Sequence, residues 1–118
     1  MTTITEMAHE RAQREIRELA DRAYAMMLDY ATTRVTDEQA KKDRVERELA
    51  ETGKTKATYD ENVFHARFLW SFDVLVNDLK CKYDESGVRA AMQLLIDENK
   101  VERWFMNGKP MGCFYLRK

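Results

Sequence analysis

This chain has little proline, glycine, cysteine or histidine. Its 118 residues include one Pro, four Gly, two Cys and two His. Two cysteines are too few for a disulfide framework, and with only two histidines they cannot supply the closely spaced ligands of a structural zinc site. The glycines, at 53, 87, 108 and 112, do not form a phosphate-binding loop. The composition therefore predicts neither a metal nor a cofactor.

Two longer signals are also missing. No run of about 18 apolar residues occurs, and no charged segment followed by an apolar one begins the chain. We therefore expect no membrane span and a cytoplasmic location. No local motif joins His65 to Cys81 or Cys113 as a nucleophile and its base, so we do not expect an enzyme.

No strong excess of charge of either sign is present. Lys and Arg number 20 and Asp and Glu 21, which gives a formal net charge of −1. A near-neutral chain is not expected to bind nucleic acid strongly without regard to sequence. Residues 100–118 differ from the rest, because they hold five basic residues and one acidic residue. Any contact with phosphates is therefore expected from local placement of charge.

The first quarter of the chain has the pattern of one long helix. Residues 5–31 lack Gly and Pro, and apolar residues recur with alternating steps of four and three. Such a heptad-like seam predicts a coiled-coil homodimer, although it could instead pack against the rest of the same chain in a compact monomer. The seam comprises Ala12, Ile16, Leu19, Ala23, Met26 and Tyr30.

A weaker helical pattern and a loop follow. Residues 36–50 have Asp37 and Glu38 near their start, where acidic side chains are favoured, but few apolar positions. Residues 51–58 have the composition of a loop or hinge. We therefore expect residues 1–58 to be a helical extension, either a long helix or a helical hairpin, and residues 59–118 to form a separate domain.

Three capped helices are expected in the second half. Asp60 is placed to cap a helix over 61–70, and Ser71 one over 72–79, in which apolar residues recur at three and four positions. After the polar residues 80–83, Asp84 is placed to cap a helix over 85–98.

The C-terminal residues predict a two-stranded hairpin. Asn99 can adopt the left-handed conformation that closes a helix, and Asn107 and Gly108 separate two β-prone runs within 101–117. Pro110, which cannot donate a backbone hydrogen bond, suits an edge position. Alternation along the strands should bury about half of the nearby aromatic residues, and this makes a stacking platform for single-stranded nucleic acid the weaker interpretation. These residues are Trp70, Trp104, Phe105, Phe114 and Tyr115.

Residues 60–118 resemble the winged helix–turn–helix superfamily. The resemblance is carried by residues 84–95 and 97–103, which are similar to the recognition helix and first wing strand of bacterial and phage members; many of those have a glycine where this chain has Asn99. It implies a mainly α fold in which a winged helix–turn–helix with a C-terminal β-hairpin follows the N-terminal helix. It further implies a small DNA-binding transcriptional regulator that reads duplex DNA with the helix 85–98 and the wing 101–117.

The side chains expected at the DNA fall into two groups. Arg and Gln on the helix can bond to guanine or adenine, whereas Lys and Arg in the turn and on the wing would contact phosphates. The first group is Ser86, Arg89 and Gln93, and the second is Lys80, Lys82, Arg103, Lys109 and Arg117. Glu85 opposes this interpretation because it would meet phosphates with like charge. The alternative is a protein-binding adaptor or inhibitor of phage or mobile-element type that uses the winged fold as a scaffold.

Overall fold

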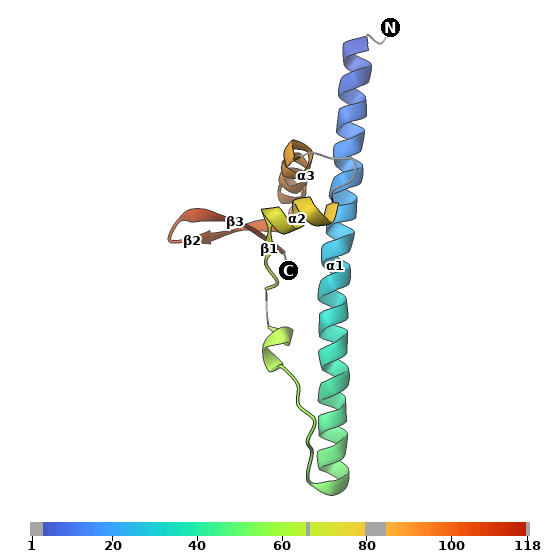
Figure 1. Ribbon diagram of the computed structural model, residues 1–118, viewed down its shortest axis with the longest axis vertical. Helices are drawn as coiled ribbons and strands as arrows, with labels where there is room; N and C mark the ends of the chain where they lie inside the picture. Colours follow the sequence, from blue (N-terminus) through green and yellow to red (C-terminus); the bar gives the residue numbers. More distant parts are fainter. Residues whose placement is uncertain (1–3, 66, 80–84, 118) are drawn as a thin grey trace. The chain divides into compact units, whose positions relative to one another are not determined.

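The computed structural model describes residues 4–65, 67–79 and 85–117, and the protein is mainly helical with a small three-stranded antiparallel sheet (Figure 1). Two compact units are present, one made of Met1–Met27 with Phe68–Lys118 and one of Leu28–Arg67, which differs from the boundary expected near residue 58. The elements are, in order, α1 (Ile4–Thr52), a 3₁₀ helix (Glu61–Phe64), β1 (Trp70–Ser71), α2 (Phe72–Leu79), α3 (Glu85–Asp97), β2 (Val101–Met106) and β3 (Lys109–Leu116).

The long N-terminal helix is confirmed, but it does not end near residue 31. Helix α1 continues without a break to Thr52, so the separate helix over 36–50 and the helical hairpin are wrong. Of the residues between the two expected helices, Thr32, Thr33 and Val35 are weak helix formers, each costing only a few tenths of a kcal/mol relative to alanine, and none is Gly or Pro. Only Gly53 stops the helix: its φ is 73°, and its N–H donates to the Leu49 carbonyl at 2.9 Å.

The expected helices α2 and α3 are both present. The Ser71 hydroxyl accepts a hydrogen bond from the Val74 N–H at 3.2 Å, which is the predicted N-cap. Helix α3 is followed by Asn99 at a φ of 60°, the left-handed residue that the sequence predicted. Asp84, predicted to cap α3, lies outside the described residues.

The helix expected over residues 61–70 is wrong. Asp60 does act as a cap, accepting from the Asn62 N–H at 3.0 Å, but only the 3₁₀ helix Glu61–Phe64 follows. Further along, Trp70 forms strand β1 opposite Phe114 of β3. Pairing with a strand more than forty residues away therefore prevails over the local helical pattern.

The sheet has the order β1-β3-β2, so the predicted hairpin is confirmed and a third strand is added. Asn107 and Gly108 connect β2 to β3 with φ values of 53° and 78°, the conformation that an Asn-Gly hairpin turn requires. The register shifts between Arg103 and Phe105, and Gly112, on the facing strand, has a φ of 69°, as expected at a bulge.

The first compact unit is held together by apolar side chains from α1, α2, α3 and the sheet. On α3 these residues recur at three and four positions, which places them on one face of the helix. On α1 they are part of the predicted seam and its neighbours. The buried set is Leu19, Ala20, Ala23, Met27, Trp70, Leu75, Leu79, Val88, Ala91, Met92, Leu95, Val101 and Phe114.

Arg17 adds a polar contact within this unit, between α1 and the turn that follows α3. Its guanidinium donates to Glu98 at 2.7 Å and to Asp21 at 2.6 Å. The hydrogen bond from Arg17 holds the pKa of the Glu98 carboxyl below its usual range. Lys100 lies near the same turn, with its ammonium nitrogen 5.2 Å from the centre of the Tyr24 ring. Both contacts orient α1 against the end of α3.

The second unit consists of the rest of α1 and the chain that returns along it. The Glu38 side chain, only 5% exposed, accepts from the Asp60 N–H at 2.8 Å and from Lys41 at 3.0 Å. The bond from Asp60 is the main reason that the pKa of Glu38 lies below its usual range. The Lys42 ammonium lies over the Tyr59 and Phe64 rings, 5.8 Å and 5.4 Å from their centres. Polar contacts thus help to hold the returning chain against α1.

Replacing Leu19 with Ala should destabilise the protein strongly. Leu19 is fully buried, so its truncation leaves a cavity and should lower the free energy of unfolding by about 2–5 kcal/mol. Met7→Ala is the matched control on the same helix, since Met7 is 57% exposed and its truncation should cost less than about 0.5 kcal/mol. Urea unfolding measures both. Equal effects of the two variants would contradict the placement of α1 in the unit.

Acidification should release the contact between Glu38 and Asp60. Because the pKa of Glu38 is lowered in the folded chain, the stability it contributes is complete above its unfolded pKa, near 4.3, and is lost as the pH falls through the lower value. The carboxyl carbon resonance of Glu38 in an NMR titration should therefore have a midpoint below about 4.3. A midpoint at or above that value would contradict the contact, and Glu38→Gln identifies the resonance.

Candidate nucleic-acid interface

Helix α3 exposes a polar strip on the side opposite its buried face. The 3.6-residue period places the predicted contact residues Ser86, Arg89 and Gln93 on this strip, and all three are exposed. Glu85 and Asp97, at the two ends of the helix, are exposed as well. The strip therefore carries one basic and two acidic side chains, and its electrostatic character is mixed.

Arg89 is positioned by an aromatic ring of the preceding helix. Its guanidinium carbon lies 4.7 Å from the centre of the Phe72 ring, at the start of α2. A guanidinium stacked on a ring is restrained in orientation while the edges of its plane can still donate hydrogen bonds. The contact therefore prepares Arg89 for a planar acceptor such as a guanine edge or a carboxylate.

Gln93 joins α3 to strand β2. Its amide nitrogen donates to Asp97 at 2.9 Å, and its amide oxygen accepts from Arg103 at 3.1 Å. The Arg103 guanidinium carbon also lies 5.6 Å from the centre of the Phe114 ring. The helix strip and the hairpin thus form one continuous surface. To make a bidentate contact with adenine, the Gln93 amide would have to give up its hydrogen bonds to Asp97 and Arg103. The sequence did not indicate these two bonds.

The remaining basic residues differ in how far neighbouring groups compensate their positive charge. Lys109 is exposed beside the hairpin turn. Arg117 donates to the Asn99 side chain at 2.9 Å and lies 3.5 Å from Glu102, so its charge is partly compensated. Lys80 and Lys82 lie outside the described residues. Among the described candidates, Arg89, Arg103 and Lys109 have the best positions for phosphates or bases.

The aromatic residues divide into buried and more exposed ones, largely as strand alternation predicted. Trp70 and Phe114 are buried, which confirms their assignment to the core. Trp104 and Tyr115 are half-buried, and the Tyr115 hydroxyl donates to Glu102 at 2.5 Å. Phe105 remains exposed. The sheet therefore presents one exposed aromatic ring near its turn and no broad stacking surface among the described residues.

The predicted dimerisation seam is divided between the core and the surface. Leu19 and Ala23 are fully buried within the first unit, so the chain itself covers the middle of the seam. Ile16 and Met26 are half-buried, whereas Ala12 and Tyr30 are exposed. The seam thus packs at least partly in cis.

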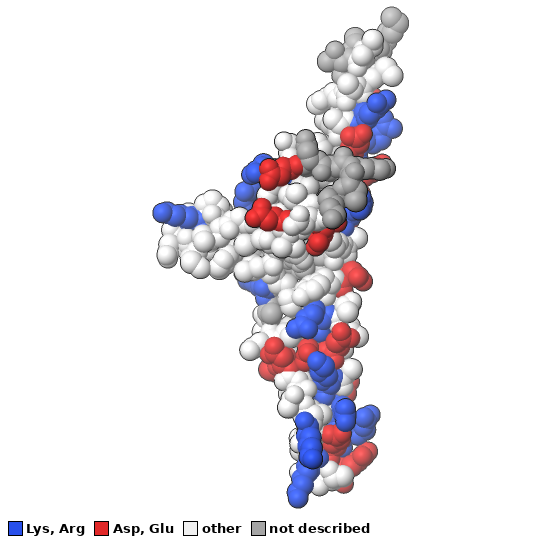
Figure 2. Space-filling view, viewed as in Figure 1, with Lys and Arg blue, Asp and Glu red and all other residues white. Residues whose placement is uncertain are grey.

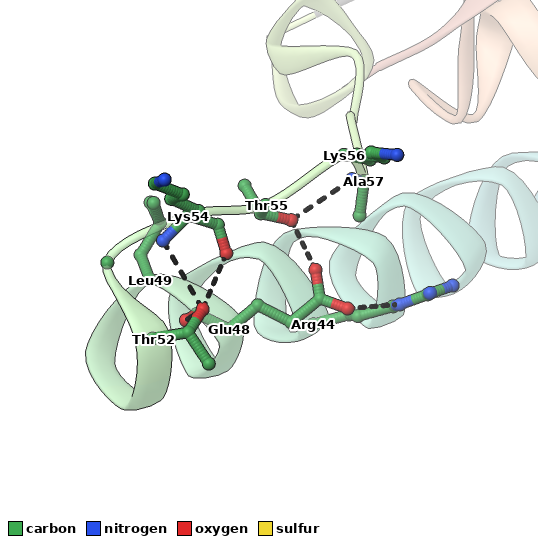
Figure 3. A pocket seen from close by; sticks show the side chains of 9 residues that line it. Arg44, Glu48, Leu49, Thr52, Lys54, Thr55, Lys56 and Ala57 are labelled. Atoms are coloured by element: carbon green, nitrogen blue, oxygen red, sulfur yellow. Dashed lines mark hydrogen bonds and ion pairs between the residues drawn. The ribbon is translucent and has the colours of Figure 1, made fainter.

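An open hollow lies in the second unit, where α1 ends and the chain turns back (Figure 3). Glu48 accepts there from Thr55 and, at 3.0 Å, from Arg44. These bonds hold the pKa of Glu48 below its usual range, so it is a poor general base at neutral pH. The Thr52 hydroxyl donates to the Glu48 carbonyl at 2.9 Å. The polar groups of the hollow thus serve to close the turn.

Comparisons with known proteins give no match, so the function of this chain is argued from its sequence and structure. No protein-family model, no curated protein and no solved structure matches this chain. In the described part of the chain, no three His, Cys, Asp or Glu side chains lie close enough together to hold a metal ion. Within the same residues, no helix combines the length and apolar content needed to cross a bilayer.

Proposed function

We propose that this chain is a small DNA-binding regulator of the winged helix–turn–helix type. The observation that carries the proposal is the continuous surface on which exposed Ser86 and Arg89 of α3 lead, through the bond between Gln93 and Arg103, to the hairpin. The order of elements supports it. An α-helix, a 3₁₀ helix, a short strand, two α-helices and a hairpin follow one another, and β1 pairs with β3 of the hairpin.

The first helix of such a domain would be the part of α1 before residue 28. This part belongs to the same compact unit as α2, α3 and the sheet, and it contributes Leu19 and Ala23 to their core. Residues 61–70, over which the sequence predicted a helix, instead form a 3₁₀ helix and the start of strand β1. On this proposal the N-terminal part of α1 takes the place of the first helix of the winged domain and completes its apolar core.

The mode of binding follows from the shape of the groove. A major groove about 12 Å wide admits one α-helix, so α3 would enter it with Ser86 and Arg89 toward the base edges. Lys109, exposed at the hairpin turn, would contact the neighbouring phosphates. A regulator of this kind would act in the cytoplasm. Its near-neutral net charge favours weak non-specific binding and makes specific contacts the main source of affinity.

A second candidate is a protein-binding adaptor or inhibitor. It is favoured by Glu85 and Asp97, which expose carboxylates at both ends of the α3 strip. Next to a phosphate backbone these carboxylates are repelled, whereas at a protein surface they can pair with Lys or Arg. A single stoichiometric protein partner recovered without DNA, together with no binding to duplex DNA, would favour this candidate.

Two substitutions should weaken duplex binding in different ways. Arg89→Ala should cost about 1–3 kcal/mol in binding free energy at a preferred site, because a base contact is lost. Lys109→Ala should weaken binding nearly equally across sequences and reduce the salt slope by about one, because a phosphate contact is lost. Fluorescence anisotropy with duplex DNA at about 50 and 200 mM salt measures both effects.

Arg14→Ala is the matched control for this experiment. Arg14 is an exposed arginine of α1, distant in sequence from α3 and the hairpin, and its loss should leave binding unchanged. If the wild-type chain bound no duplex even at the lower salt concentration, the proposed function would be wrong. If Arg89→Ala and Lys109→Ala both bound like wild type, the proposed mode would be wrong.

Homodimerisation is proposed through the parts of the α1 seam that the core does not cover. Exposed Ala12 and Tyr30 lie on either side of the buried middle, and a dimer would place two recognition helices about 34 Å apart on the DNA. Sedimentation equilibrium should give twice the chain mass of 14.0 kDa at tens of micromolar protein. One species at 14.0 kDa would show a compact monomer instead.

A further inference from the structure

The end of the β2–β3 hairpin is apolar on its surface. Phe105, Met106 and Met111 are 54%, 45% and 44% exposed, and Pro110 is exposed beside them. Residues 104–116 include a single charged residue, Lys109. Figure 2 shows the hairpin as a nearly uncharged surface with one cationic group at its end. These five residues, Phe105, Met106, Lys109, Pro110 and Met111, are called the wing tip below.

Backbone geometry gathers the wing tip at the narrow end of the hairpin. Phe105 pairs with Pro110 and Met106 with Lys109, on either side of the two-residue turn. Met111 follows directly and is succeeded by Gly112, whose positive φ marks the bulge in β3. Large side chains therefore project from a tip that is only two strands wide.

The length of β2 sets how far the wing tip reaches beyond its contact with α3. Arg103 is hydrogen-bonded to Gln93 of α3, and Asn107 at the turn is four residues further along the strand. At about 3.3 Å per residue, the turn lies roughly 13 Å beyond Arg103. This distance is close to the major-groove width of about 12 Å, so with α3 in that groove the tip extends past the flanking phosphates.

We propose that the wing tip inserts into the minor groove of duplex DNA as an apolar wedge that unstacks a base step. This inference rests on the proposed DNA binding. Phe, Met and Pro are side chains that minor-groove proteins insert between base pairs, and the unstacked step bends the duplex toward the major groove. At the wing tip these side chains are exposed together, and Phe105 is more exposed than Met106 and Met111.

Charge complementarity selects DNA as the occupant. Lys109 provides a cation for the phosphates at the mouth of the groove, and residues 104–116 contain no carboxylate to repel them. The acidic residue of the hairpin, Glu102, lies at the end of β2 away from the turn, and Glu85 and Asp97 belong to α3. The apolar surface and the lone cation of the tip therefore suit a site with stacked bases inside and negative charge outside.

A sequence preference follows from the same step. Pyrimidine–purine steps such as TA and TG unstack more easily than the steps of a stiff A-tract. The wedge should therefore favour duplexes rich in TA or TG steps even though no hydrogen bond reads those bases. The preference should depend on the wing tip and should be independent of Arg89.

The test uses 2-aminopurine, whose fluorescence rises when it unstacks. It replaces adenine at the TA steps of a duplex of about 20 base pairs, and anisotropy of the same duplex reports binding separately. Saturation with the wild-type chain should raise the fluorescence by about twofold or more. Phe105→Ala combined with Met111→Ala should give less than half of that rise at saturation. Phe105→Leu, which keeps a wedge-sized side chain, should retain most of it.

Val74→Ala is the matched control, because Val74 is also 45% exposed but lies on α2. It should leave the fluorescence rise unchanged, and circular dichroism checks that every variant is folded. Salt-sensitive binding without a fluorescence rise, or an equal rise with the double variant, would overturn the wedge and leave the proposed DNA binding intact. No binding in the anisotropy channel would overturn both.

Discussion

The pairing of Trp70 with Phe114 is the contact on which the candidate interface depends. Both side chains are buried, and the pair joins the two-residue strand β1 to the central strand of the sheet. Ser71, the next residue, both pairs with Cys113 and caps α2. The start of α2 in turn places Phe72 beneath the Arg89 guanidinium. A single long-range strand pair therefore positions α2, the hairpin and the arginine that the proposal places at the DNA.

Local signals predicted most of the elements in the C-terminal half. Ser71, Asn99 and the Asn107–Gly108 turn each act through their own backbone or a neighbour within a few residues, so a short window of sequence contains their effect. Strand β1 could not be predicted in this way, because two residues carry no period and their partner is more than forty positions away. The unbroken α1 was missed for a different reason: weak helix formers near residues 32–36 lower helix stability without ending the helix.

The candidate site was predictable to a similar extent. Helical period was sufficient to expose Ser86 and Arg89 and to bury Val88 and Met92. The period could not show that Gln93 is bonded to both Asp97 and Arg103, because one of those partners comes from the hairpin. Nor could composition show that Leu19 and Ala23 pack in cis. A heptad-like seam has the same pattern whether it faces a second chain or its own sheet and helices.

The central claim is that the α3 strip and the hairpin act together as one surface for duplex DNA, and NMR mapping tests it most directly. Amide chemical shifts of the full chain would be followed during titration with duplex DNA. The account predicts that the largest changes fall on Ser86, Arg89, Gln93 and residues 103–111, and that they occur in parallel at helix and hairpin. Changes confined to α1 or to the second unit, or no changes at all, would contradict it.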